Sequence, residues 1–156
     1  SILPDNLKVD YISLMPNKLQ LIVSSELKTP SKSNFEFLKN QSLIYRESGS
    51  GTRQIMENYL LENKIQINKK IELTSNEAVK QSVIAGLGLS IMPLIGIKRE
   101  LKSKDLKVVP MKGLPIVTNW YLIWLKGKQH SPIATSLLSH IEAHKDEIIK
   151  KHFEDL

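Results

Sequence analysis

Polar and apolar residues alternate near the start of the chain, over residues 9–14 and again over residues 19–23. A period of two is typical of β-strands that bury one face. Pro16 and Asn17 lie between the two stretches and favour a turn, so the pattern predicts two strands joined there. Near the other end, the nearly continuous apolar run over residues 120–125 predicts a further strand.

Two strand-to-helix transitions come next in the sequence. A short apolar strand over residues 43–45 leads into a glycine- and serine-rich turn, after which apolar residues recur at helical spacing from Ile55 onwards. A second strand over residues 70–74 leads into a helix that Asn76 can cap and whose apolar face reaches Leu87. Strands that alternate with helices predict an α/β fold with a largely parallel sheet and helices on its faces.

Three shorter elements and one long helix complete the pattern. The shorter elements are a strand over residues 89–92, a helix over residues 95–101 and a strand over residues 106–111. Ser131 as cap and Pro132 in the first turn predict the start of the long helix. Its apolar stripe consists of Ile133, Ala134, Leu137, Leu138 and Ile141.

The composition fits one globular domain or two small lobes. The chain has 156 residues, of which 41% are hydrophobic and 24% charged. It has no cysteine, which excludes disulfides, thiolate metal sites and cysteine nucleophiles. The net charge of +6 comes mostly from scattered lysines, which are typical of a solvated surface, so we expect no nucleic-acid face on this chain. No apolar run approaches the ~20 residues of a membrane span, so we expect no membrane contact.

Two of the three arginines, Arg46 and Arg53, lie in one eight-residue window between a strand and a helix start. The first turn of a helix presents unpaired backbone N–H groups, and glycines let a ligand approach them. Hydroxyl groups of Ser50 and Thr52, together with either guanidinium, would complete an anion site. The alternative is an ordinary capping turn in which the arginines are exposed or paired with Glu47.

A second helix start follows the next strand at Thr74, Ser75 and Asn76. In a parallel sheet it would lie at the same edge as the first, and ligands of open α/β sheets bind at such an edge. The alternative is again a plain N-cap.

Other recognisable chemistry is weak in this sequence. The glycine-rich window lacks the lysine of a nucleotide-binding P-loop, and no hydrolase nucleophile motif occurs. His140 and His144 have a spacing that can hold a metal, but surface histidines on a helix are commoner than ligands. No nucleophile and base stand out as a pair, so we expect no enzyme activity, no cofactor and no metal.

Four stretches of the sequence carry a resemblance to a known family. They read RESGSGTR at 46–53, TSNEAVK at 74–80, VIAGLGLSIMP at 83–93, and WYLIW at 120–124 with SP at 131–132. In this order, and over nearly the whole chain, they resemble the C-terminal effector-binding region of LysR-type transcriptional regulators. The first and the last are more similar to the CbbR branch, which controls carbon-fixation (Rubisco) genes in bacteria and plastids. The resemblance implies a transcription regulator that senses a metabolite.

The resemblance also implies a fold and a domain division. The fold is that of type 2 periplasmic binding proteins, two α/β lobes joined by crossing strands. Residues 1–24 and 119–156 would form the first lobe with the connecting strands, and residues 25–118 the second lobe. Family members begin with a winged helix-turn-helix and the first part of lobe one, so we expect this chain to lack the DNA reader and about half of the cleft.

Carried over residue by residue, the resemblance implies that the effector contacts lie on two loops. They are Ser48, Gly49, Ser50, Gly51, Thr52, Arg53, Thr74, Ser75 and Asn76. Arg53 would either contact the effector or support its loop from behind. The effector would be a small anionic metabolite, such as a phosphorylated sugar acid, a sugar bisphosphate or a 2-oxo acid.

Partners and location follow from the same resemblance. We expect a homodimer or homotetramer in which the helix over residues 54–63 is a candidate interface, and DNA contact only through the absent N-terminal domain. The location would be the bacterial cytoplasm or the plastid stroma. A solute-binding protein of a transporter shares the fold and is the alternative, against which the lack of a signal peptide argues.

Overall fold

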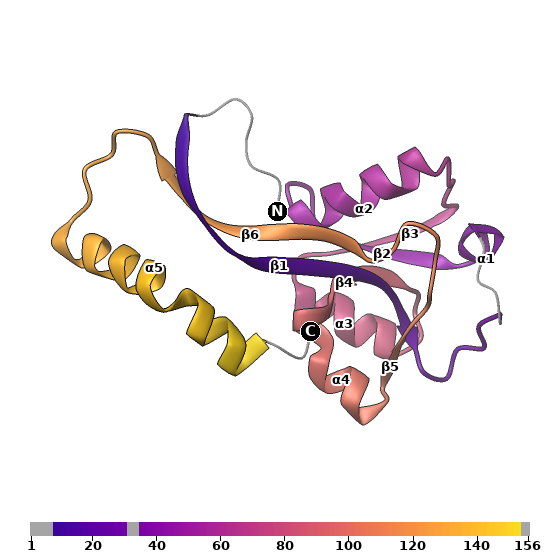
Figure 1. Cartoon of the computed structure of the whole chain (residues 1–156). Coiled ribbons are helices and arrows are strands. Elements are labelled where there is room, and N and C mark those ends of the chain that lie inside the picture. The colour runs from indigo at the N-terminus through magenta and orange to yellow at the C-terminus, as the bar shows by residue number, and fades with distance from the viewer. Residues whose placement is uncertain (1–7, 31–34, 154–156) are drawn as a thin grey trace. The chain divides into compact units, whose positions relative to one another are not determined.

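The computed structural model describes residues 8–30 and 35–153 (Figure 1). The chain divides into two compact units, Ser1–Asn17 with Thr118–Leu156, and Lys18–Val117. We call them the smaller and the larger unit and describe each by itself. Among the described residues, no helix combines the length and the apolar character that crossing a membrane requires.

The larger unit contains a mixed set of strands. The second half of β1 (Val9–Ser24) pairs antiparallel with β4 (Ser90–Pro93) and with β5 (Leu106–Val108). By contrast, β2 (Ser42–Arg46) and β3 (Lys69–Leu73) pair in parallel. An isolated parallel bridge also joins Leu43 of β2 to Leu89, just before β4. The prediction of a largely parallel sheet was therefore wrong for the pairing of β1 with β4 and with β5. A local strand–helix alternation reports chain connections and carries no signal for pairing with β1, which lies far away in sequence.

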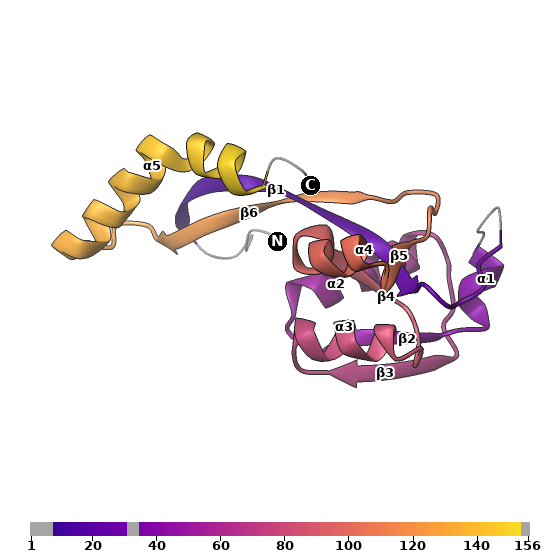
Figure 2. The same cartoon turned by 90° about the horizontal axis from the view of Figure 1, so that it is seen from below.

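Two hydrophobic clusters occupy the two faces of these strands. Because side chains alternate along β2, Leu43 and Tyr45 enter one cluster and Ile44 enters the other. The first cluster contains the buried face of α2 (Gly51–Glu62), and the second that of α3 (Asn76–Ile84). The helices α2 and α3 accordingly lie on opposite sides of the strands (Figures 1 and 2).

Three local expectations differ from the structure. Pro16 and Asn17 form no turn, and β1 runs through them without a break, because extended backbone accommodates the fixed φ of proline. The helix expected over residues 95–101 is a 3₁₀ turn, η1 (Leu94–Ile97), followed by α4 (Lys98–Ser103). Leu87 lies beyond the end of α3 and is 57% exposed. Gly86, with φ +76°, ends that helix as a glycine after the C-cap does. The short helix α1 (Phe35–Lys39) contributes Leu38 to the core.

The smaller unit consists of the first half of β1, β6 (Ile116–Leu125) and α5 (Pro132–Phe153). β6 pairs with β1. The side-chain amide of Asn17 donates to the Thr118 hydroxyl at 3.4 Å, and that hydroxyl donates to the backbone carbonyl of Asn17 at 3.4 Å. The hydroxyl of Ser131 accepts a hydrogen bond from the Ala134 N–H at 3.2 Å, so the predicted cap of the long helix is confirmed. None of the described residues of α5 is fully buried, and its apolar stripe stays largely exposed.

Candidate functional site

Two loops of the larger unit leave the sheet at one edge. Arg46 at the end of β2 is in register with Leu73 at the end of β3, and the two strands are parallel. The loop after β2 opens α2, and the loop after β3 opens α3. The structure therefore brings the N-termini of both helices, with their positive dipole ends, to the same edge.

The first loop exposes backbone at the start of α2. Ser50 caps the helix: its hydroxyl accepts from the Arg53 N–H at 3.5 Å and its carbonyl from the Gln54 N–H at 3.0 Å. The N–H groups of Gly51 and Thr52 lie in the first turn and have no intrahelical acceptor. No heavy atom lies within 4 Å of the position that a Cβ of Gly51 would take. Ser48 and Gly49 are exposed at the tip, and Gly49 supplies the positive φ of +89° that the turn requires.

Arg46 links the two loops. Its Nε and Nη2 each donate to a carboxylate oxygen of Glu47 at 2.7 Å, and its Nη1 donates to the side-chain oxygen of Asn76. The hydrogen bond with Glu47 raises the pKa of Arg46, and the same hydrogen bond lowers the pKa of Glu47. Both groups therefore keep their charges at neutral pH, and Arg46 carries a full positive charge at the start of α3.

Arg53 braces the first loop. Its Nε donates to Glu57 at 2.8 Å and its Nη1 to Glu72 at 2.5 Å. The same Nη1 also donates to the backbone carbonyl of Arg46 at 3.2 Å, and the guanidinium carbon lies 5.8 Å from the ring centre of Tyr45. These contacts connect α2, β3 and the end of β2, and they engage the guanidinium with two carboxylates.

The second loop caps α3 through a different residue than the sequence suggested. Ser75, with extended backbone angles, is the N-cap, and its hydroxyl accepts from the Ala78 N–H at 3.0 Å. Asn76, expected to cap, is the first helical residue, and its side-chain oxygen is bound by Arg46. Serine and asparagine are both good N-caps, so composition alone does not fix which of two neighbours takes the position. Thr74 is exposed beside them.

The sequence did not predict the contact between Arg46 and Asn76, because it joins residues 30 positions apart. The pairing of Arg46 with Glu47 was one of the alternatives considered there. The role of Glu72 carried no sequence signal, because its contact with Arg53 depends on the β2–β3 register.

The histidine pair of α5 lies elsewhere, in the smaller unit. The rings of His140 and His144 stack with centres 4.4 Å apart, and Nδ1 of His144 lies 3.0 Å from the carbonyl oxygen of His140. Within residues 8–30 and 35–153, no three His, Asp or Glu side chains gather as a metal site would require. The two loops of the larger unit, by contrast, offer N–H donors, hydroxyls and a guanidinium to an anion.

The fold and these loops define an α/β ligand-binding domain of the type 2 periplasmic-binding-protein class. Residues 3–146 match the family model of the LysR substrate binding domain, and the chain belongs to that family.

Curated relatives are transcriptional regulators. The chain is 38% identical over 147 residues to the HTH-type transcriptional activator CmpR of Synechocystis sp. PCC 6803. The matched region covers 93% of this chain and 48% of CmpR. The chain is also 32% identical over 130 residues to the HTH-type transcriptional regulator CbbR of Rhodospirillum rubrum, covering 83% of this chain and 44% of CbbR. The chain thus spans about half the length of the curated relatives it matches.

Solved structures share the fold. The regulatory domain of CcmR from Synechocystis PCC6803, in complex with 2-PG, matches with a TM-score of 0.83 and 30% identity over 93% of this chain and 71% of that one. The effector binding domain of QuiR in complex with shikimate matches with a TM-score of 0.78 at 19% identity, over 94% of this chain and 70% of that one, and supports the fold alone.

Proposed function

We propose that this chain is the effector-sensing part of a LysR-type transcriptional regulator of carbon-fixation genes, and that its two loops bind a small anionic metabolite. The observation that carries the proposal is the meeting of the α2 and α3 N-termini with the Arg46 guanidinium at one sheet edge. Helix N-termini and arginine both stabilise anions. The similarity to CmpR and CbbR supports the regulatory role and the gene class.

The residues take different roles in this proposal. The N–H groups of Gly51 and Thr52 and the hydroxyl of Thr52 contact the anion, and Ser50 holds the first turn in place. Ser48 and Gly49 shape the tip of the first loop, and Thr74 and Ser75 that of the second. Arg53 is a positioning residue, because its guanidinium is bound by Glu57 and Glu72. Asn76 orients Arg46.

The effector class follows from the charges of the two loops. A group with oxygen atoms and negative charge, a carboxylate or a phosphate, matches the N–H donors and the guanidinium. The relative CcmR was solved with 2-PG, which makes phosphorylated acids the first candidates to test. Binding then changes the balance between two conformations of the regulator, and this change alters its contact with DNA.

The division of the chain fits this proposal. We assign residues 25–118 to the second lobe, which the compact unit Lys18–Val117 supports, and residues 1–24 with 119–156 to the first. This chain covers 71% of the CcmR regulatory domain, so in the whole protein a further segment completes the first lobe. DNA contact belongs to the helix-turn-helix part of the whole regulator, which works as a homodimer or homotetramer in the bacterial cytoplasm or the plastid stroma. It acts as a sensor and not as an enzyme.

A thermal-shift panel tests the proposal. The chain is melted at fixed ionic strength with sulfate, phosphate, 2-oxoglutarate, 2-phosphoglycolate or ribulose bisphosphate, and the same panel is run on Ser50→Ala/Thr52→Ala. We expect a saturable rise in Tm with at least one phosphorylated acid and no such rise in the double variant. A ligand that binds only the folded state adds RT ln(1 + [L]/Kd) to its stability.

Ser131→Ala is the matched control. It also removes an N-cap hydroxyl, but at the start of α5 in the smaller unit, so it lowers the Tm without ligand and leaves the ligand-dependent rise intact. An equal ligand-dependent rise in the Ser50→Ala/Thr52→Ala variant contradicts the placement of the site on these loops.

A further inference from the structure

The Arg46 guanidinium is already occupied by a carboxylate of the chain itself. Resting on the function proposed above, we propose that Glu47 is an internal competitor that sets how tightly this site binds its effector. Its carboxylate takes the Nε–Nη2 edge of Arg46, at 2.7 Å for each hydrogen bond, and an anion that binds this edge must displace it.

Among Arg46, Arg53 and Lys80, Arg46 is paired with the fewest carboxylates. The guanidinium of Arg53 contacts Glu57, Glu72 and a backbone carbonyl. The ammonium of Lys80, on α3, lies 2.8 Å from a carboxylate oxygen of Glu77 and 2.8 Å from one of Glu100. Each of these two cations is held by two carboxylates, whereas Arg46 is held by one, and Nη1 of Arg46 bonds to a neutral amide.

The partner of Arg46 can be displaced. Glu47 is the next residue in the chain and stands at the start of the exposed first loop, and its side chain is 34% exposed. On losing Arg46 its carboxylate is hydrated by solvent and needs no other protein partner. The side chain of Arg46 is only 18% exposed, and Asn76 keeps the guanidinium at the start of α3 while Glu47 leaves.

The exchange costs every anion the same free energy, because Glu47 leaves Arg46 whichever anion arrives. A carboxylate ligand replaces one carboxylate by another at Arg46 and gains little there. A phosphate monoester carries a charge of about −1.5 to −2 at neutral pH and has three acceptor oxygens, so it gains charge and hydrogen bonds in the exchange. Glu47 thus lowers the affinity for both classes of ligand by the same factor, and phosphate esters remain the tighter ligands.

The test compares two probes of similar size on the wild-type chain and on Glu47→Gln. The probes are 2-phosphoglycolate and succinate, in which a carboxylate stands in place of the phosphate, and calorimetry at fixed ionic strength gives each Kd. In Glu47→Gln we expect succinate and 2-phosphoglycolate each to bind about tenfold more tightly, within the usual range of such couplings. The ratio of the succinate Kd to the 2-phosphoglycolate Kd therefore stays close to its wild-type value.

Glu57→Gln is the matched control, because it makes the same change of charge on a glutamate that pairs with Arg53. Its two Kd values should stay close to those of the wild type. Unchanged Kd values in Glu47→Gln, or the same tightening in Glu57→Gln, overturn the role of Glu47. The role of Glu47 is also overturned if a folded Glu47→Gln variant binds neither probe, because the guanidinium of Arg46 is released in that variant.

The outcomes separate this inference from the function on which it rests. If 2-phosphoglycolate stabilises the wild type and the Ser50→Ala/Thr52→Ala variant loses that effect, the proposed function stands whatever Glu47→Gln does. If the loop variant keeps the effect, the proposed site fails, and the role of Glu47 at it fails with the site.

Discussion

Gly88 has the least room for a side chain among the glycines of the larger unit. A Cβ there would lie 2.4 Å from the carbonyl oxygen of Ser42, which accepts the Leu89 N–H at 2.9 Å and so links β2 to the start of β4. Gly88→Ala must shift this backbone contact, and we expect it to lower the free energy of unfolding by about 2–3 kcal/mol in urea titrations. Gly96→Ala, where no atom lies within 4 Å, should change it by less than about 1 kcal/mol. Equal effects would contradict this account.

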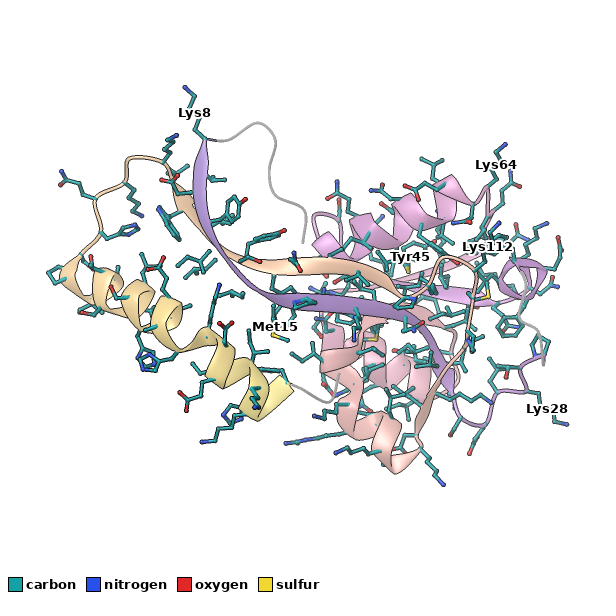
Figure 3. All side chains as sticks on the ribbon, in the orientation of Figure 1. Lys8, Met15, Lys28, Tyr45, Lys64 and Lys112 are labelled. Carbon is teal, nitrogen blue, oxygen red and sulfur yellow. The ribbon has the colours of Figure 1, made fainter. Side chains whose placement is uncertain are left out.

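Tyr45 couples the stability of the larger unit to alkaline pH. Burial and the nearby Glu57 raise its pKa from 10.0 to about 12, and its side chain, labelled in Figure 3, is buried in the first hydrophobic cluster. Between these values the unfolded chain loses the proton and the folded chain keeps it, so stability is complete below pH 10 and falls as the pH rises toward 12.

Tyr45→Phe removes this dependence. From pH 9 to pH 11 the unfolding free energy of the wild type should fall relative to that of the variant, by at most about 1.4 kcal/mol per pH unit. Urea titrations at each pH measure it. Tyr59, whose pKa is also raised by burial, remains in the variant and keeps part of the alkaline decline. A difference that is constant with pH would rule out a raised pKa at Tyr45.

Single residues differ in how far the sequence predicts them. The cap at Ser131 follows from a local backbone requirement, and this prediction is confirmed. The helix end at Gly86 has a local cause of the same kind, the positive φ that glycine adopts readily. Arg46 was recognised as a candidate by its position in the loop, but its bond to Asn76 depends on how two distant segments are placed. Local chemistry is readable from sequence, whereas a partner 30 residues away is not.

At the scale of elements, helix α2 holds the loop at Lys112 and Gly113 in place through a hydrogen bond of Tyr59. The hydroxyl of Tyr59 donates to the carbonyl of Lys112 at 2.7 Å, and a Cβ on Gly113 would lie 3.2 Å from the Tyr59 ring. Tyr59→Phe should lower the free energy of unfolding by about 1 kcal/mol in urea titrations. The Tyr121 hydroxyl accepts a longer hydrogen bond, at 3.4 Å from the Asn119 side-chain nitrogen, so Tyr121→Phe should lower the free energy of unfolding by less. The reverse order would contradict the role of the Tyr59 hydrogen bond.

Most helices and strands were predictable because each carries its own period of apolar residues. β2, α2, β3 and α3 lie where strand and helix patterns placed them. The pairing of β1 with β4 and β5 was not, since alternation along one strand does not name its neighbours. The local turn signal of Pro16 and Asn17 was also misleading, because the extended backbone of β1 accommodates the fixed φ of proline.

At the scale of the whole molecule, the two units differ in how well they bury apolar side chains. The larger unit holds two clusters of buried residues, whereas α5 of the smaller unit exposes Ile133 by 82% and Leu137 by 55%. Beside α5, a hollow of about 440 Å³ lies against β6 and is lined largely by apolar side chains such as Leu122 and Leu138. Apolar surface of this kind marks contact with another segment or chain.

The smaller unit should therefore bind an apolar dye. Ile133→Lys/Leu137→Lys should remove most of the dye fluorescence and change the free energy of unfolding by no more than about 0.5 kcal/mol, because both side chains are largely exposed already. Leu61→Lys serves as the control, since Leu61 is 79% exposed on α2 in the larger unit and its replacement should leave the fluorescence unchanged. If the wild-type chain binds no dye, or if Leu61→Lys removes as much fluorescence as the double variant, the exposed stripe of α5 is not an adhesive surface. The same variants in light scattering then show whether copies of the chain meet through this stripe, since association through it would be lost in the double variant alone.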